Sequence, residues 1–230
     1  MSREQLALSA AVPDGAPDAA HAEKMDRQYR YQRHVYDLTR KYYLFGRDRL
    51  MEGLDARAGQ SVLEVGCGTG RNIACMARRY PDARFFGLDI SRAMLETAEK
   101  KFAATGSTRP VLRAADATAF RAADFGETGF DRVVISYSLS MIPAWRDAVQ
   151  RALDALNPGG SLHVVDFGQQ ERLPAAFRRL LQGWLARFHV TPRPDLMNVI
   201  ADAAARRGAI VASETPYGGS AWLSIARMPG

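Results

Sequence analysis

The chain has 230 residues, 47% of them hydrophobic, which suffices for one folded domain with a full core. It contains no apolar run of about 18 residues, and its first residues lack the pattern of a secretory signal. Its two cysteines do not suggest a structural disulfide, so a cytoplasmic location is expected. The net charge of +6 favours anionic partners, among them nucleic acid, acidic lipid surfaces and phosphorylated substrates.

Three regions differ in composition. Residues 1–22 are rich in Ala, Pro, Asp and Gly and are predicted to be a disordered tail. Residues 23–50 carry two aromatic stripes at helical spacing with arginines between them, which predicts an amphipathic helical cap. Residues 51–230 are predicted to form the main domain, with a helical insertion over 169–198 on its substrate side.

Strands alternate with helices along the main domain. The expected strands cover residues 61–65, 84–88, 111–117, 130–136, 161–166, 209–214 and 221–226. The expected helices cover residues 70–79, 91–101, 145–156 and 197–207. Residues 157–160, Asn-Pro-Gly-Gly, predict a tight turn before the fifth strand. This alternation predicts an α/β fold, a doubly wound, mostly parallel seven-stranded sheet with helices on both faces.

The most informative stretch is residues 61–70, Ser-Val-Leu-Glu-Val-Gly-Cys-Gly-Thr-Gly. An apolar strand leads into Gly66, Gly68 and Gly70, and a helix follows at once. Glycine lets a ligand approach the backbone, and the helix N-terminus offers free N–H groups. Asp89 ends the next strand, where a carboxylate would meet ribose hydroxyls. The alternatives are a generic nucleotide-binding turn or a glycine-rich loop without a ligand.

This stretch resembles the [ED]-x-G-x-G-x-G motif of class I S-adenosylmethionine methyltransferases, with Glu64 as its acid. The resemblance implies S-adenosylmethionine as methyl donor, S-adenosylhomocysteine as product, and a Rossmann-like methyltransferase fold. It places Glu64 near the methionyl end of the donor and Asp89 on the ribose, and it brings Asp116 and Ala117 to the adenine amino group. The donor site that it implies comprises Glu64, Gly66, Gly68, Gly70, Asp89, Ile90, Asp116, Ala117 and Ser136.

The segment after the fourth strand, residues 136–143, lacks the [DNS]-P-P-[YF] motif of DNA amino-methyltransferases. DNA is therefore disfavoured and no nucleic-acid partner is expected, although RNA stays an open alternative. Tyr137 is either a catalytic residue beside the sulfonium or a buried core tyrosine. His163 is expected in the core. His34 and His189 have no partners at metal-ligand spacing, so no metal is expected.

Residues 25–50 resemble the N-terminal signature of bacterial betaine-lipid N-methyltransferases. Their Tyr-Asp…Phe-Gly-Arg pattern also resembles bacterial phosphatidylethanolamine N-methyltransferases. The first resemblance implies three methylations of diacylglyceryl-homoserine to the trimethyl betaine lipid, and a helix that covers the donor and meets the membrane. It implies a donor-capping, catalytic role for Tyr36 and peripheral association with the anionic inner membrane. It also implies functional coupling to the enzyme that makes the homoserine lipid.

The chemistry of such a reaction suits the residues of the predicted cap. Aromatic faces bind quaternary ammonium groups, and Tyr29 is an expected acceptor-binding residue. A homoserine carboxylate needs a cation, for which Arg30, Arg33 and Arg40 are candidates. Three functions stay open: a lipid-amine N-methyltransferase, a methyltransferase of a soluble amine or of RNA, and a donor-binding protein without catalysis.

Overall fold

The computed structural model describes residues 46–105, 109–170, 179, 183 and 191–230. The predicted tail, all but the end of the predicted 23–50 cap, and most of the predicted 169–198 insertion lie outside these residues. The domain boundaries therefore stay predictions.

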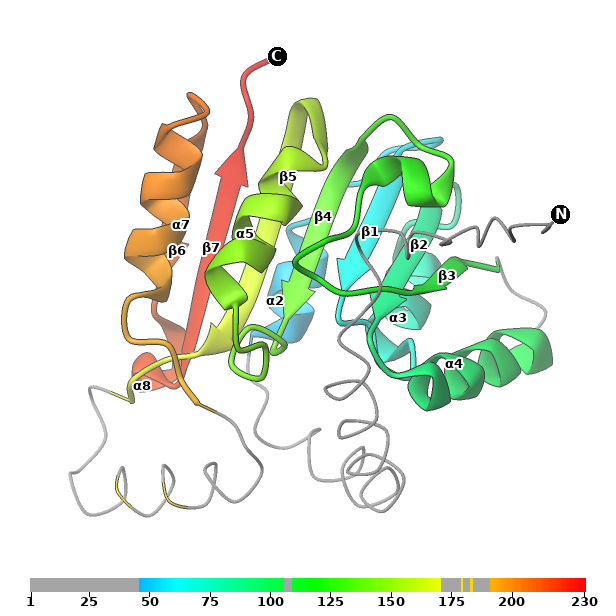
Figure 1. The fold of residues 1–230 in the computed structure, drawn as a ribbon, viewed down its shortest axis with the longest axis horizontal. Coiled ribbons are helices and arrows are strands. Elements are labelled where there is room, and N and C mark those ends of the chain that lie inside the picture. Colours follow the sequence, from blue (N-terminus) through cyan, green and yellow to red (C-terminus); the bar gives the residue numbers. More distant parts are fainter. Residues whose placement is uncertain (1–45, 106–108, 171–178, 180–182, 184–190) are drawn as a thin grey trace, which may run out of the picture.

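The described residues form a seven-stranded sheet in the order β3-β2-β1-β4-β5-β7-β6. The strands are β1 (Ser61–Val65), β2 (Arg84–Asp89), β3 (Val111–Ala114), β4 (Phe130–Ser136), β5 (Leu156–Phe167), β6 (Ile210–Glu214) and β7 (Ala221–Arg227). The first five run parallel to one another, and β7 is antiparallel to both of its neighbours, β5 and β6. Figure 1 shows the sheet with β7 pointing opposite to β5.

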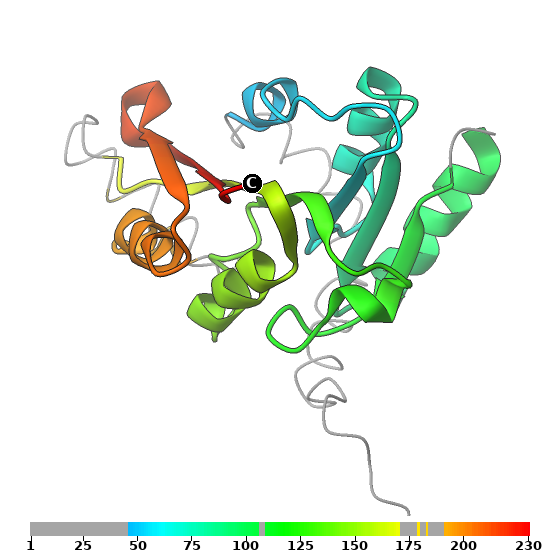
Figure 2. The ribbon, with the colours of Figure 1, turned by 90° about the horizontal axis from the view of Figure 1, so that it is seen from above.

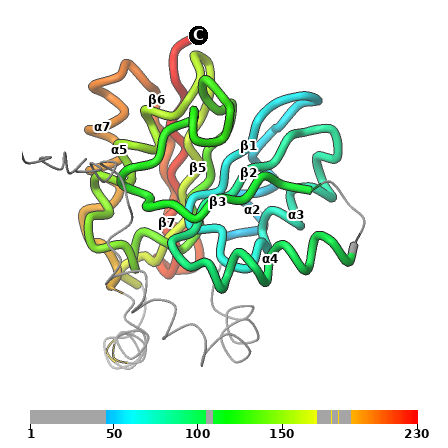
Figure 3. The backbone as a smooth tube through the Cα atoms, turned by 45° about the vertical axis from the view of Figure 1, so that its right-hand side comes forward, coloured from blue at the N-terminus to red at the C-terminus, as the bar shows by residue number. Residues whose placement is uncertain are grey.

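Helices cover both faces of the sheet. They are α2 (Arg47–Glu52), α3 (Arg71–Arg79), α4 (Arg92–Thr105), α5 (Trp145–Asp154), α7 (Leu196–Ala205) and α8 (Pro216–Gly219), with a 3-10 turn η1 (Ala122–Phe125). Figures 2 and 3 show α5 and α7 on one face and α2 and α3 on the other. Each face has its own apolar core, one packed around α5 and α7 and the other around α2, α3 and α4. The predicted doubly wound fold is confirmed.

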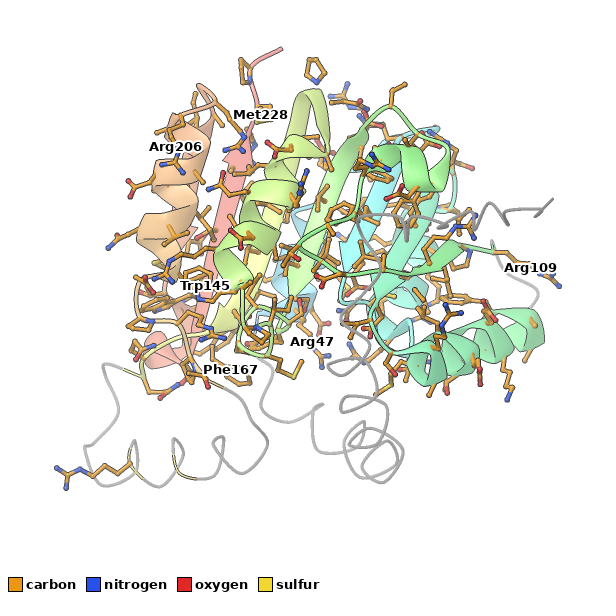
Figure 4. The ribbon with its side chains drawn as sticks, in the orientation of Figure 1. Arg47, Arg109, Trp145, Phe167, Arg206 and Met228 are labelled. Carbon is orange, nitrogen blue, oxygen red and sulfur yellow. The ribbon has the colours of Figure 1, made fainter. Side chains whose placement is uncertain are left out.

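The parallel register brings the carboxyl ends of β1, β2 and β4 to one edge of the sheet. Val65 lies beside Leu88 of β2 and Ile135 of β4, so the loops after these strands start at the same level. Ligands of open α/β sheets bind at this edge. In Figure 4, Arg47 and Phe167 lie toward the edge formed by these carboxyl ends, which is at the bottom of the view, whereas Arg206 and Met228 lie toward the opposite edge.

Several predicted boundaries differ from the structure by a few residues, and two of these differences bear on the site and on β5. The third strand ends at Ala114 rather than at residue 117, because Asp116 accepts hydrogen bonds from the Thr118 N–H and hydroxyl at 2.8 and 2.7 Å and so forms a turn. The turn predicted over residues 157–160 is instead an irregular part of β5. There the Gly159 N–H donates to the Pro229 carbonyl and the Gly160 carbonyl accepts from the Met228 N–H, which keeps the segment beside the end of the chain.

Candidate active site

The glycine turn after β1, residues 66–70, is folded against the end of β2; we call it the donor loop. The Gly66 and Cys67 N–H groups both donate to the Leu88 carbonyl, at 2.8 and 2.9 Å. Gly68 has φ +53°, which L side chains rarely adopt, and a Cβ built on it would meet nothing within 4 Å. The loop thus presents bare backbone to open space, as a ligand-binding turn requires.

Asp89 connects this loop to the next helix. One carboxylate oxygen accepts the Gly68 N–H at 2.8 Å, and the other accepts the Ser91 N–H at 2.9 Å. The Ser91 hydroxyl in turn accepts the Met94 N–H at 3.3 Å, so Ser91 caps the first turn of α4. Asp89 is therefore both a structural link and an acid at the cavity edge.

Glu64 lies inside β1 with 1% of its surface exposed. Its Oε1 accepts a 2.7 Å hydrogen bond from Asn72 of α3, while Oε2 is buried without a hydrogen-bond partner among the described residues. Burial raises its pKa to about 8, although Asn72 and the nearby Arg47 guanidinium act in the opposite direction. Glu64 and Arg47 line one small cavity of about 50 Å³ beside the donor loop. A group that carries both an ammonium and a carboxylate, as an amino acid does, complements this pair.

A larger cavity of about 270 Å³ adjoins the donor loop. It is lined by Gly66, Gly68, Leu88, Asp89, Ile90, Met94, Ala115, Asp116, Ala117, Thr118, Ser136, Tyr137, Ser138, Met141, Ile142, Pro143 and Ala144. Ser136 lines both cavities, and its hydroxyl is buried without a hydrogen-bond partner within the described ranges. One ligand that spans the two cavities would pass this hydroxyl.

Most of the donor residues that the sequence indicates therefore come together at one edge. Glu64 lines the small cavity, Gly70 ends the donor loop at the start of α3, and the others line the large cavity. Asp116 and Ala117 meet the cavity from the turn after β3, not from the strand itself. The individual roles of these residues stay predictions.

Tyr137 follows β4 directly and forms part of the cavity wall with 2% of its surface exposed. Its φ of +55° turns the chain sharply, and its ring packs edge-on against Phe167, with 4.7 Å between ring centroids. Burial, with the Asp166 carboxylate as a further cause, raises the pKa of its phenol far above the usual value. Tyr137 is thus a neutral phenol at physiological pH, both buried and part of the cavity wall.

The other residues named for catalysis and acceptor binding, Tyr36, Tyr29, Arg30, Arg33 and Arg40, lie outside the described residues. Conversely, the structure brings in Arg47, Asp166 and Arg193, to which sequence reasoning gave no role. Asp166 had a usable signal, because it is an acid near the end of the fifth strand, as Asp89 is at the end of the second. Arg193 had none, since its contacts depend on tertiary structure alone.

His163 lies in β5 and is buried, as predicted, with its Nε2 at 2.8 Å from the Ser161 hydroxyl. Burial lowers its pKa to about 3, so it is neutral. Within residues 46–105, 109–170 and 191–230, no three His, Cys, Asp or Glu side chains are grouped as metal ligands. Within the same ranges, no helix has the length and apolar character needed to cross a membrane.

Comparison with known proteins gives one family match, to the Methyltransferase domain model, over residues 62–160. Residues 62–160 therefore match a methyltransferase domain, and the described residues have the Rossmann-like methyltransferase fold. The matched range contains the donor loop, Asp89 and Asp116, which are the residues at the cavities described above.

Individual relatives support the same assignment. The chain is 33% identical over 137 residues to a ubiquinone/menaquinone biosynthesis C-methyltransferase, UbiE, of Desulfotalea psychrophila, covering 57% of this chain and 53% of that protein. It is 34% identical over 139 residues to the methyltransferase GfsG of Streptomyces halstedii, covering 60% and 48%. The chain thus spans about half the length of these curated relatives. The S-adenosylmethionine-dependent methyltransferase SibL shares the fold with a TM-score of 0.64 at 24% identity, covering 85% of this chain and 58% of SibL.

The residues present fit the methyl donor. Glu64 and Arg47 would hold its amino-acid end, Asp89 its ribose, and Asp116 with Ala117 its adenine. When bound, S-adenosylmethionine supplies an electrophilic methyl group on a sulfonium. The protein's own contribution would be to orient the donor through these residues and to exclude water from the cavity that Ser136 and Tyr137 line.

We predict that Gly68→Val and Asp89→Ala both weaken S-adenosylhomocysteine binding. Valine at φ +53° is strained and fills the open backbone surface, while alanine removes the ribose acceptor and the Gly68 hydrogen bond. A charged hydrogen bond contributes about 1.5–3 kcal/mol, so calorimetry should show an affinity loss of roughly 10- to 150-fold for Asp89→Ala. Asp202→Ala, on the exposed face of α7, is the control. Wild-type affinity in both site variants would contradict the assignment of this cavity.

Glu64 gives a pH-dependent prediction for stability. Its pKa in the folded protein, about 8, exceeds the ordinary value of 4.5, so the folded state holds a proton that the unfolded state releases. This contribution is complete below pH 4.5 and is lost as the pH rises toward 8, at up to about 1.4 kcal/mol per pH unit. Urea denaturation from pH 5 to 8 should show that the stability difference between Glu64→Gln and wild type shifts in favour of the variant. Parallel curves for the two proteins would refute the raised pKa.

Proposed function

We propose that this chain is an S-adenosylmethionine-dependent N-methyltransferase of a lipid amine headgroup. The acceptor is diacylglyceryl-homoserine, which it converts to the trimethyl betaine lipid, and phosphatidylethanolamine is the alternative acceptor. The proposal combines the resemblance of residues 25–50 with the charges around the large cavity.

The buried carboxylate of Asp166, which acts electrostatically on Tyr137, is the main reason to propose nitrogen as the atom that is methylated. Asp89 and Asp116 add two more acids at the cavity, while Arg47 lies at the amino-acid end of the donor site. Attack by a neutral amine forms an N–C bond, breaks the S–C bond, and leaves positive charge on nitrogen and a neutral thioether. Nearby carboxylates stabilise that developing charge. The ammonium proton then leaves to solvent before the next transfer.

The cavity wall also suits an amine that is carried on a lipid. Met141, Ile142, Pro143 and Ala144 give one side of the large cavity an apolar lining. Tyr137, a neutral phenol, also lines this cavity, and the Phe167 ring packs against it. Aromatic faces bind methylated ammonium groups at about 0.5–2 kcal/mol each. A growing trimethylammonium group would thus gain contacts with each transfer.

A second candidate is C-methylation of a quinol, because UbiE proteins are among the curated relatives. The nucleophile for that reaction is an electron-rich ring, most reactive as a phenolate. The carboxylates at this cavity repel an anionic acceptor. Electrostatics therefore favour the amine.

Transfer of tritium from labelled S-adenosylmethionine tests the proposal. The acceptors are diacylglyceryl-homoserine and phosphatidylethanolamine in detergent micelles, reduced demethylmenaquinone, bulk RNA and ethanolamine. We expect label in the homoserine lipid, with mono-, di- and trimethylated products resolved by mass spectrometry. Asp89→Ala protein supplies the background. Label in the quinol or RNA alone would refute the lipid-amine assignment.

Membrane docking is part of the proposal, because a lipid acceptor does not leave the bilayer in useful amounts. Each basic residue near an anionic surface contributes about 1 kcal/mol, screened by salt. Flotation with vesicles should show binding that rises with anionic lipid and falls with salt. Replacing Arg27, Arg30 and Arg33 by Glu should release the protein, whereas deleting residues 1–22 should not. Wild-type protein that stays unbound at low salt would favour a soluble amine instead.

A further inference from the structure

The large cavity has a second wall, formed by Tyr137, Ser138 and residues 141–144; we call the segment 137–144 the acceptor wall. Its backbone is held at several points by residues outside the range matched by the methyltransferase family, 62–160. The Ser140 N–H donates to Asp166 Oδ2 at 3.1 Å, and the Ser140 carbonyl accepts from the Thr191 N–H at 3.0 Å. Both backbone polar groups of Ser140, the N–H and the carbonyl, are thus hydrogen-bonded to residues outside the wall.

Arg193 holds the same wall. Its Nε donates to the Leu139 carbonyl at 3.2 Å, and its Nη2 donates to the Ile142 carbonyl at 2.9 Å. The guanidinium also lies over the Trp145 ring, 5.9 Å from the ring centroid. Because Asp166 and Arg193 attract each other electrostatically, the two groups that grip the wall carry complementary charges.

Asp166 is an unusual residue for its place in the fold. It has 1% of its surface exposed and stands in β5 between apolar neighbours, opposite Trp222 of β7. A buried carboxylate is costly unless it is hydrogen-bonded. Here each oxygen accepts a backbone N–H, Oδ2 from Ser140 and Oδ1 from Phe167 at 2.8 Å. Asp166 does not line the cavity itself, so apart from its charge it acts on the cavity through the residues that it holds.

We propose that Asp166 is a positioning residue for the acceptor wall. Its carboxylate fixes Ser140 and thereby sets Tyr137 and Met141 at the distance from the donor loop that admits the acceptor, while Arg193 secures the neighbouring carbonyls. Phe167, which Asp166 also holds, packs on the Tyr137 ring and completes the link. This inference rests on the proposed function only in so far as the acceptor enters beside Tyr137.

The substitution Asp166→Asn isolates this role. Asparagine has nearly the same size but only one acceptor oxygen, so it cannot accept both the Ser140 and Phe167 N–H groups. His163→Gln is the matched control, because His163 is a buried polar residue of the same strand that bonds Ser161 instead of the wall. Arg193→Gln provides a second variant, which removes the guanidinium contacts without altering β5.

Hydrogen exchange resolved by peptide is the first readout. We expect residues 138–144 to exchange at least about tenfold faster in Asp166→Asn and in Arg193→Gln, with the donor loop unchanged. S-adenosylhomocysteine affinity should stay within about twofold of wild type. His163→Gln should leave the acceptor wall unchanged. Wild-type exchange at 138–144 in both site variants, or a uniform increase across the domain, would overturn the positioning role.

The kinetic readout uses diacylglyceryl-homoserine in detergent micelles with saturating donor. We expect Asp166→Asn to raise the acceptor KM at least about tenfold while the donor KM stays constant. A fall in donor affinity equal to the change in acceptor KM would overturn the proposal, since it would mark general loss of structure. If wild-type protein does not methylate this lipid, the proposed function fails, and hydrogen exchange with donor affinity decides the role of Asp166 alone.

Discussion

The site depends on the way the donor loop is fastened to the end of β2. Three N–H groups of this loop, from Gly66, Cys67 and Gly68, donate to acceptors at Leu88 and Asp89. These hydrogen bonds fix the turn in a left-handed conformation, so that its bare backbone faces the cavity. The Asp89 carboxylate also accepts the N–H of Ser91, the residue that caps α4. One carboxylate therefore connects the donor loop, β2 and α4. A change at Asp89 therefore alters the shape of the site as well as its charge.

Charge is distributed unevenly along the site. Arg47 lies with Glu64 at the small cavity, where an amino-acid group finds a guanidinium for its carboxylate and a buried carboxyl group for its ammonium. The large cavity, in contrast, has acids from β2 and from the turn after β3, with Asp166 behind its far wall. Burial raises the pKa of Asp166 only to about 6, so it is largely ionised at neutral pH. This asymmetry suits a reaction that leaves a cation on the acceptor.

The fold and the grouping of the expected donor residues at one edge of the sheet both follow from local sequence patterns. A short apolar run followed by regularly spaced glycines identifies β1 and the donor loop. Asp89 is identified because it is the acid at the end of the next strand, one helix further along the chain. The hydrophobic pattern predicts a strand that includes Asp116. In the structure the Asp116 side chain instead accepts a hydrogen bond from the Thr118 N–H and forms a turn after β3, which hydrophobic periodicity does not reveal. The strand assignment over 157–160 was missed because it arises from pairing with residues 228–229, distant in sequence.

The acceptor side was less predictable for a physical reason. Asp166 and Arg193 form hydrogen bonds with the backbone of residues 139–142. Every residue type has these backbone groups, so the sequence of this segment does not indicate which side chains bind it. Arg47 became part of the site only because α2 packs on the sheet beside the donor loop. Sequence motifs thus indicate the residues expected to bind the donor, whereas tertiary contacts form the wall proposed to meet the acceptor.

A crystal structure with bound S-adenosylhomocysteine tests the central claim most directly. The account predicts one ligand across both cavities, with its amino-acid end between Glu64 and Arg47, its ribose on Asp89 and its adenine beside Asp116 and Ala117. Its sulfur should lie beside Ser136 and face the Tyr137 wall. A ligand bound in the reverse orientation, or at another place on the sheet edge, would contradict both the donor site and the acceptor wall inferred from it.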